Sequence, residues 1–144
     1  MPGHFAQHSG FTRKQRESIL YLGHLFRGDT REKIDKRFEE CGYYCGRWET
    51  VEGERIPVTS FSLSPLSAMD YSLNLSRYGR IVLVAIDTGK YIDSMRPGLE
   101  VWEIEVLGGI SKEDIIEVDC PEKLKSLYRI DDPVVERYYN SVFS

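Results

Sequence analysis

Three polar segments of this chain carry residue types that could act together on a charged, sugar-containing substrate. The first is residues 27–31, Arg-Gly-Asp-Thr-Arg, and the second is residues 60–64, Ser-Phe-Ser-Leu-Ser. The third holds Glu103 and Glu105, just ahead of the Leu-Gly-Gly-Ile of residues 107–110. In this order, and each attached to an apolar stretch, they describe a cleft that could hold a dianionic pyrophosphate, orient a ribose and stabilise a cation.

Cleavage of a glycosidic bond at a ribose gives each of these residue types a role. The cleavage develops positive charge on the ribose, as in the oxocarbenium-like transition states of glycosidases, so a carboxylate is needed beside the ring. Arg27 can offer a planar fork of donors to a phosphate or a ribose oxygen, and Asp29 and Arg31 can orient it. Ser60 can hydrogen-bond the carboxylate or the substrate, and no nucleophilic serine is required.

Four helices are predicted to help position these segments. Capping residues begin the first and the last, helical spacing followed by a glycine defines the second, and proline begins the third. The predicted helices cover residues 12–20, capped by Thr12 and Gln15, then residues 32–41 and residues 66–75, opened by Pro65, and a short segment that begins at Asp132 and Pro133.

Strands are predicted where β-favouring or continuously apolar residues occur. Residues 81–86, Ile-Val-Leu-Val-Ala-Ile, have the composition of a buried strand. Glycine and proline indicate loops over residues 46–57 and 87–99. Residues 87–98 are the candidate mobile loop, which could cover a bound substrate or contact a target molecule. The fold class is α+β with more strand than helix, and the strands are expected at residues 20–26, ending just before Arg27, and at residues 58–62, 80–87, 101–107 and 114–119.

Length and composition indicate a single globular domain. The chain has 144 residues, 41% hydrophobic residues and a mean hydropathy of -0.38, which is the usual size and character of one soluble domain. No apolar run approaches the roughly 20 residues of a membrane span, and the first residues lack the layout of a secretory signal. The net charge of -4 disfavours broad nucleic-acid binding and favours a protein target.

The cysteines and histidines predict neither a disulfide framework nor a metal site. The odd number of cysteines, Cys41, Cys45 and Cys120, fits a reducing compartment better than an oxidising one. A zinc site at Cys41 and Cys45 would need at least two more ligands, and the three histidines supply no clear pair.

As an ordered set, the three segments resemble the motifs of the mono-ADP-ribosyltransferase toxins, in the Arg-Ser-Glu class of the cholera and pertussis toxin catalytic subunits. Residues 25–31 are similar to the aromatic-Arg-x-Asp-Ser-Arg motif of that family. Residues 60–64, together with Ala68, match its Ser-Thr-Ser segment without a gap and depart from it only at Phe61. Glu103 with the Leu-Gly-Gly-Ile that follows resembles the family's catalytic glutamate and the glycines after it. Residues 137–140, Arg-Tyr-Tyr-Asn, resemble the tail of the family's sequences.

The resemblance, which covers residues 22–140, implies a fold and an activity. The fold would be two packed antiparallel or mixed β-sheets with flanking helices and an NAD cleft, in a single domain over residues 1–144 with residues 1–19 as an N-terminal extension. The activity would be transfer of ADP-ribose from NAD to a macromolecule, favouring a protein, with release of nicotinamide. NAD would be a substrate, and no metal would be needed.

The resemblance also implies a biological setting. The chain would be a toxin or virulence effector that is secreted or delivered and acts in the cytoplasm of a target cell, as a monomer and without a membrane span. Its partners would be the target protein and, in some settings, an immunity protein or a host activator.

By the resemblance, the cleft residues take specific roles. Arg27, Ser60 and either Glu103 or Glu105 would be catalytic. NAD would be bound by Arg27, Gly28, Asp29, Arg31, Ser60 and Ser62. The aromatic residues Tyr71, Tyr78 and Tyr91 are candidates to stack on nicotinamide or adenine.

The sequence leaves the choice of glutamate open. Strand alternation places Glu103 and Glu105 on one face. Counting back five positions from the first glycine of Gly-Gly-Ile selects Glu103, whereas the family's Glu-x-Glu signature would select Glu105. With Glu103 as the catalytic residue, Val101 stands where arginine-modifying members carry a glutamate, so arginine as the acceptor is not favoured.

Other interpretations remain open at this point. Alone, each segment could be ordinary structure: a surface turn with an ion pair, an edge strand with a helix cap, or the solvated face of a strand. Their joint occurrence favours function. A NAD glycohydrolase, with water as the acceptor, would share the same chemistry, and the departures at Phe61 and Val101 favour a binding module without activity.

Overall fold

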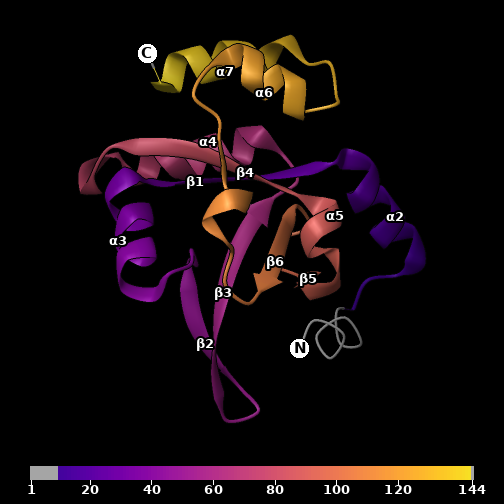
Figure 1. Cartoon of the computed structure of the whole chain (residues 1–144). Helices are drawn as coiled ribbons and strands as arrows, with labels where there is room; N and C mark the ends of the chain where they lie inside the picture. Colours follow the sequence, from indigo (N-terminus) through magenta and orange to yellow (C-terminus); the bar gives the residue numbers. More distant parts are fainter. Residues whose placement is uncertain (1–9, 144) are drawn as a thin grey trace.

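The computed structural model describes residues 10–143, which form helices and strands around one sheet (Figure 1). The strands are β1 His24–Thr30, β2 Arg47–Val51, β3 Glu54–Ser62, β4 Ile81–Asp87, β5 Met95–Pro97, β6 Glu103–Leu107 and β7 Ile116–Glu117. The helices are α2 Arg13–Leu22, α3 Arg31–Cys41, α4 Pro65–Leu75, α5 Thr88–Tyr91, α6 Pro121–Leu127 and α7 Pro133–Phe143. The α+β class is confirmed.

The described strands form one antiparallel sheet in the order β5-β6-β3-β1-β4-β7, and β2 pairs with β3 off this path. β1 pairs with β4 along its whole length, but it meets β3 at one register pair only, Phe26 opposite Ser62. The sheet therefore has two halves that join at this point. Two separate sheets were predicted; in the described residues the Phe26–Ser62 pair joins the strands into one.

Apolar side chains from the two halves pack together in a common core. This first core cluster includes residues of β1, β4, β3 and β6, namely Leu25, Val82, Val84, Ile86, Phe61, Ile104 and Val106. A second cluster lies between the β1–β4 half and helices α4, α6 and α7, and contains Phe26, Ala68, Met69, Leu83, Ala85, Leu124, Val135 and Tyr139. Figure 1 shows α6 and α7 together beyond α4, at the opposite end of the molecule from the β2–β3 turn.

The predicted N-terminal helix is confirmed and is longer than expected. Thr12 and Gln15 form the capping box, and the helix runs to Leu22 before Gly23, at φ 80°, ends it. The strand predicted at residues 20–26 is therefore wrong at its start: β1 begins at His24, so Arg27 lies in mid-strand rather than at a strand exit. Ile19 is 4% exposed in the first core cluster, so part of the predicted extension packs on the fold, and residues 1–9 lie outside the described residues.

The other helix predictions agree with the structure. α3 ends at Gly42, which adopts the left-handed conformation, α4 begins at Pro65, and the backbone N–H of Val134 donates to Asp132 at the start of α7. α6 was not predicted, although Pro121 stands at its first position.

Both predicted loops contain regular structure. Residues 46–57 include β2 and the first part of β3, an antiparallel hairpin whose turn uses Glu52 at φ 51° and Gly53 at φ 81°. The polar composition reflects the partial exposure of β2 rather than a lack of structure. Residues 87–99 contain α5 and β5, and β5 pairs with β6. β7 is limited to two residues of the strand expected at 114–119.

Candidate functional site

A pocket of about 380 Å³ lies where the two halves of the sheet diverge. Both members of the Phe26–Ser62 pair line it, and its volume is typical of small-molecule sites. Its walls come from β1, α3, β2, β3, α4 and the start of β6. The lining residues are Phe26, Arg27, Gly28, Lys33, Gly46, Arg47, Ser60, Phe61, Ser62, Ser67, Ala68, Tyr71, Trp102 and Glu103.

Arg27 is fixed in this pocket by neighbours on three sides. Its Nε donates to the Tyr44 hydroxyl at 2.6 Å, Nη1 donates to the Ser60 carbonyl at 2.9 Å, and Nη2 lies 3.5 Å from Asp29 Oδ2. Only 8% of Arg27 is exposed. Burial alone would lower the pKa of Arg27, but Tyr44 and Asp29 more than reverse that effect, so its pKa is raised. The guanidinium is therefore a fixed cation in the pocket wall.

Tyr44 and Asp29 support Arg27 from behind the pocket. The Tyr44 hydroxyl donates to Asp29 Oδ2, and Asp29 Oδ1 accepts the backbone N–H of Thr30 at 2.8 Å. Tyr44 is fully buried and Asp29 is 1% exposed. The predicted role of Asp29 in orienting Arg27 agrees with these contacts, although Asp29 does not line the pocket. Tyr44 was missed because no motif indicated that the segment between Cys41 and Cys45 reaches this site.

Replacing Tyr44 by Phe should lower the free energy of unfolding by about 1–3 kcal/mol, because buried partners lose a hydrogen bond. Burial raises the pKa of Tyr44 in the folded protein. Its contribution is therefore complete below the unfolded pKa of about 10 and is lost as the pH rises above that value. Denaturant unfolding of both proteins at pH 8 and pH 11 should show a smaller difference at the higher pH; a difference that grows would contradict this role.

The two serines of β3 occupy different positions in the pocket. Ser60 links two arginines, since its carbonyl accepts from Arg27 and its Oγ accepts from Arg47 Nη1 at 3.0 Å. The Ser62 Oγ accepts the backbone N–H of Ser64 at 3.0 Å, just before α4 begins. Phe61, between them, points into the first core cluster. The phenylalanine at this position therefore has a packing role.

The structure separates the two candidate glutamates. Glu103 lines the pocket and lies opposite Ser62 in the β3–β6 pairing, and its Oε1 accepts the backbone N–H of Leu99 at 3.1 Å. Glu105 lies opposite Ser60 but is not among the lining residues. The two residues share a strand face, as alternation predicted, but their carboxylates have different surroundings.

Glu105 is held in a closed ring of four alternating charges. Its Oε2 accepts from Arg47 at 2.5 Å and its Oε1 accepts from Arg96 at 2.7 Å. Glu49 completes the ring, with contacts of 2.7 Å to Arg47 and 2.8 Å to Arg96. Although burial acts to raise it, hydrogen bonds from both arginines lower the pKa of Glu49. The ring occupies both oxygens of Glu105 with protein partners.

Gly28 allows α4 to pack directly against β1. A Cβ at this position would lie 2.0 Å from Ser72 Oγ and 2.5 Å from the Ala68 carbonyl oxygen. Ala68 and Tyr71 of the same helix line the pocket. Gly28 was predicted to bind NAD; in the structure it lines the pocket, and the close packing at this residue sets the position of the pocket wall.

Replacing Gly28 by Ala should force α4 away from β1 and cost about 1–3 kcal/mol of stability through overpacking. Thermal unfolding measures the cost. Gly89→Ala is a suitable control, because the nearest atom to a Cβ there lies at 3.2 Å, on the Asp87 side chain. Equal unfolding temperatures for wild type and Gly28→Ala would contradict the packing argument.

Two of the aromatic residues that line the pocket are exposed, Tyr71 and Trp102. Tyr71 was predicted as a stacking candidate; it is 45% exposed, and the Arg27 Cζ lies 5.7 Å from its ring centroid. Trp102, 43% exposed, was missed, although it immediately precedes Glu103 in the sequence. The other two candidates are not among the lining residues: the Tyr91 hydroxyl donates to Asp114, and Tyr78 is 65% exposed beside Arg77.

Arg31, predicted to bind NAD and to orient Arg27, is not among the residues that line the pocket. Its guanidinium pairs with Glu117 and, at 3.5 Å, with Asp35. The change of direction from β1 into α3 explains this, because α3 begins at Arg31. In contrast, Lys33, in the first turn of that helix, does line the pocket and was missed.

Arg47 was also missed, and the reason is the loop prediction for residues 46–57. In β2 it pairs with Val58 of β3, and it reaches Ser60 and Glu105 from there. Strand alternation across a predicted hairpin would have placed Arg47 and Glu49 on one face. That pattern was the available signal.

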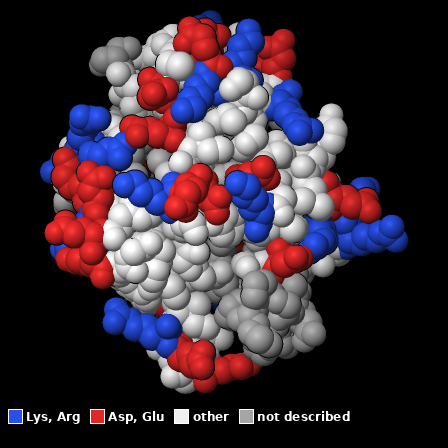
Figure 2. All heavy atoms as spheres, in the orientation of Figure 1, with Lys and Arg blue, Asp and Glu red and all other residues white. Residues whose placement is uncertain are grey.

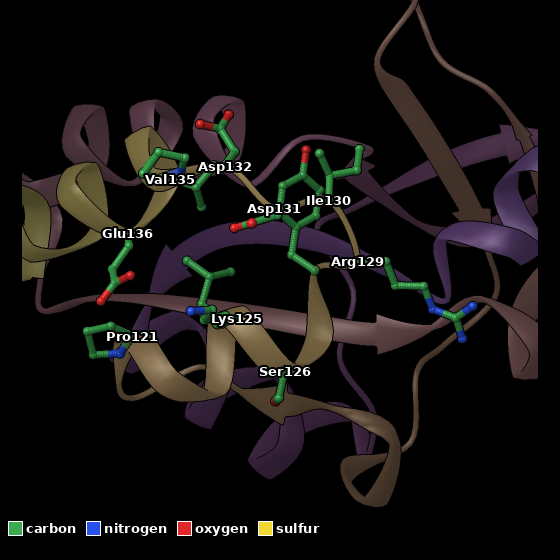
Figure 3. Close-up of a pocket in the computed structure, with 12 residues that line it drawn as sticks. Pro121, Lys125, Ser126, Arg129, Ile130, Asp131, Asp132, Val135 and Glu136 are labelled. Carbon is green, nitrogen blue, oxygen red and sulfur yellow. The ribbon is translucent and has the colours of Figure 1, made fainter.

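A second pocket, of about 350 Å³, lies between α6 and α7 and includes none of the predicted site residues (Figure 3). Buried Leu124 and Val135 contribute to it, together with Lys125 and Glu136 of opposite charge. Figure 3 shows Arg129 extending away from the other labelled residues, and its Cζ lies 5.8 Å from the Tyr21 ring. No ligand class follows from this mixture.

The surface, the possible metal ligands and the helices add three observations. Lys and Arg alternate with Asp and Glu over the face shown in Figure 2, without a broad area of one sign. Within residues 10–143, no three His, Cys, Asp or Glu side chains are grouped to hold a metal. In the same range, every helix is too short or too polar to cross a membrane.

No family model, curated protein or solved structure matches the chain. The fold and the site by themselves define the class: an α+β domain with one antiparallel sheet and a pocket at the junction of its halves. The pocket brings together Arg27, Gly28, Ser60, Ser62 and Glu103 from three separate sequence segments. The resemblance to the mono-ADP-ribosyltransferase toxins stays a prediction.

Proposed function

We propose that this chain is an NAD-dependent mono-ADP-ribosyltransferase, a toxin or effector that transfers ADP-ribose from NAD to a protein and releases nicotinamide. One observation carries the proposal: Arg27, Ser60 and Glu103, the three residues on which the resemblance depends, line one pocket. They come from β1, β3 and β6, which are far apart in sequence. Their meeting in one pocket, in the combination that the resemblance requires, supports the proposal.

In the proposed reaction, the bond between the ribose C1′ and the nicotinamide nitrogen breaks, and its electron pair goes to the nicotinamide ring. Positive charge then develops on the ribose, and the Glu103 carboxylate stabilises it. A nucleophile of the target forms the new bond to C1′ and loses its proton. Binding and chemistry are separate here, because Arg27 holds the substrate and Glu103 acts on the transition state.

Arg27 is suited to hold NAD because its position is fixed before the substrate arrives. Its contacts with Tyr44, Asp29 and the Ser60 carbonyl leave little side-chain freedom to lose on binding. A planar guanidinium can donate two parallel hydrogen bonds to a phosphate or to ribose oxygens. Ser60, bonded to both Arg27 and Arg47, would orient the reacting part of the substrate.

Glu103 is favoured over Glu105 as the catalytic carboxylate. The charge of Glu105 is already balanced by Arg47 and Arg96, so it has less to offer a developing cation. Glu103 lines the pocket and its carboxylate accepts a hydrogen bond from the backbone N–H of Leu99, and among the described residues no cation balances its charge in an ion pair. Tyr71 and Trp102 supply exposed aromatic faces at the same pocket, on which a nicotinamide or adenine ring could stack.

The test is incubation of the purified chain with NAD labelled in its adenylate part, with and without a cell lysate. Label that becomes covalently attached to a lysate protein, together with nicotinamide release, is the expected result. Nicotinamide release with all label remaining as free ADP-ribose would identify a glycohydrolase instead. A folded chain that binds NAD but releases no nicotinamide would identify a binding module and would overturn the proposal.

A further inference from the structure

The pocket carries an excess of positive charge in an acidic protein. Arg27, Lys33 and Arg47 line it, and Glu103 is the one carboxylate among its lining residues, whereas the whole chain has a net charge of -4. Asp29 and Glu105 balance part of this charge from behind the pocket wall. A concave site with local positive charge attracts an anionic ligand.

Arg27 and Arg47 each have N–H groups that their hydrogen bonds to the described part of the chain do not use. A guanidinium has five N–H groups, and Arg27 uses three of them on Tyr44, Ser60 and Asp29. Arg47 uses one Nη1 donor on Ser60 and its Nη2 donors on Glu49 and Glu105. Among the described residues, two N–H groups of each arginine have no partner, so both can bind a ligand without giving up their protein contacts.

Lys33 stands where a cation is unfavourable unless an anion is near. It lies in the first turn of α3, after the Thr30 cap, and the positive end of a helix dipole disfavours a cation there. Burial lowers the pKa of Lys33, and Arg27 and Arg37 lower it further, while Asp29 opposes them. The nearest carboxylate oxygen, on Asp29, is 3.9 Å from Nζ, so a bound anion would relieve this repulsion.

We infer that Arg47 and Lys33, together with Arg27 of β1, form a diphosphate-binding subsite in the pocket. Arg47 and Lys33 belong to none of the sequence motifs described above. The inference rests on the proposed function for its ligand, because NAD carries a pyrophosphate with two negative charges. Arg47 and Lys33 come from β2 and α3, so they would hold the pyrophosphate from two sides. Arg47 and Lys33 would increase the affinity for the substrate, whereas Glu103 would stabilise the positive charge that develops on the ribose.

The experiment is calorimetric titration of the full chain with ADP-ribose, inorganic pyrophosphate and adenosine. Wild type is expected to bind ADP-ribose, with pyrophosphate as a competitor and adenosine much weaker. Arg47→Met and Lys33→Met should each weaken ADP-ribose binding by about 10-fold or more, because each removes a charge-assisted hydrogen bond. Arg47→Lys, which keeps the charge without the fork, should bind with intermediate affinity.

Two controls separate this role from a structural one. Arg96→Met opens the same charge ring as Arg47→Met but does not change a lining residue, so it should lower thermal stability similarly and leave the ADP-ribose affinity within about twofold. Lys36→Met removes a charge from the same helix as Lys33, at an exposed residue that faces Glu40. It should leave both affinity and stability nearly unchanged.

The outcomes distinguish this subsite from the catalytic proposal. Unchanged ADP-ribose affinity in both Arg47→Met and Lys33→Met, or equal losses in Arg96→Met and Arg47→Met, would overturn the subsite even if the chain releases nicotinamide. Affinity that depends on Arg47 and Lys33 in a chain that releases no nicotinamide would support the subsite and remove the catalytic proposal.

Discussion

Replacing Glu103 by Gln is expected to reduce nicotinamide release from NAD by about 100- to 1,000-fold, the usual loss when one group that stabilises transition-state charge is removed. The carboxamide keeps the size of the side chain and can still accept the 3.1 Å hydrogen bond from the Leu99 backbone. The fold should therefore remain intact, and the Km for NAD should change less than kcat. Steady-state kinetics with thermal unfolding of the same preparations measures both.

Glu100→Gln and Glu105→Gln are the matched comparisons. Glu100 is exposed, three residues away, and does not line the pocket, so its variant should behave as wild type. Glu105→Gln breaks the charge ring, so we expect a stability loss of about 1–3 kcal/mol with a much smaller loss of kcat. A collapse of kcat in Glu105→Gln, with normal kcat in Glu103→Gln, would reverse the assignment.

Removal of the Arg27 guanidinium should have the largest combined effect on stability and activity. In Arg27→Met, Asp29 at 1% exposure loses a cationic neighbour and the Tyr44 hydroxyl loses a donor. Breaking a buried ion pair from one side typically costs about 3–5 kcal/mol. That is a large share of the stability of an ordinary domain. In urea denaturation, this variant is therefore expected to unfold at a lower urea concentration than wild type.

Arg27→Lys separates binding from folding. It keeps a cation near Asp29, so most of the stability should remain, but it cannot form the planar fork of hydrogen bonds. We expect activity at subsaturating NAD to fall by about 100-fold, an effect comparable to the loss of one well-oriented donor. Arg80→Lys, at an exposed residue just before β4, is the control. Equal activity in Arg27→Lys and wild type would contradict the anchoring role.

Local signals in the sequence were sufficient for most helices and for the continuously apolar strand β4. Thr12 with Gln15, Gly42, Pro65 and Asp132 each act through the backbone within a few residues, so they predicted helix ends that the structure confirms. The boundary at Gly23 was missed because an apolar end of α2 runs directly into β1. Composition alone did not reveal that Gly23 reverses the backbone there.

The hairpin of β2 and β3 shows why the other site residues could not be predicted. Its polar residues are paired across strands, and the pairing brings Arg47 to Ser60 and Glu105 although 58 positions separate Arg47 from Glu105. Likewise, Tyr44 reaches Asp29 across 15 positions. Such contacts are set by the register of the sheet, which no local pattern specifies once the segment is taken for a loop.

The pocket itself depends on where the sheet separates. Phe26 opposite Ser62 is the single pairing between β1 and β3, and the order of the motifs predicted that their residues would meet without indicating this junction. The side-chain environments at that junction also distinguish Glu103 from Glu105, which strand alternation placed together. The sequence therefore predicted the membership of the pocket better than its geometry.

Nicotinamide release from NAD by the purified wild-type chain, measured with and without a cell lysate and beside Glu103→Gln, tests whether this pocket cleaves NAD. We expect release by wild type that is lost in the variant. A folded wild-type chain that releases no nicotinamide under either condition, or a variant that releases it at the wild-type rate, would contradict the proposal that this pocket cleaves NAD.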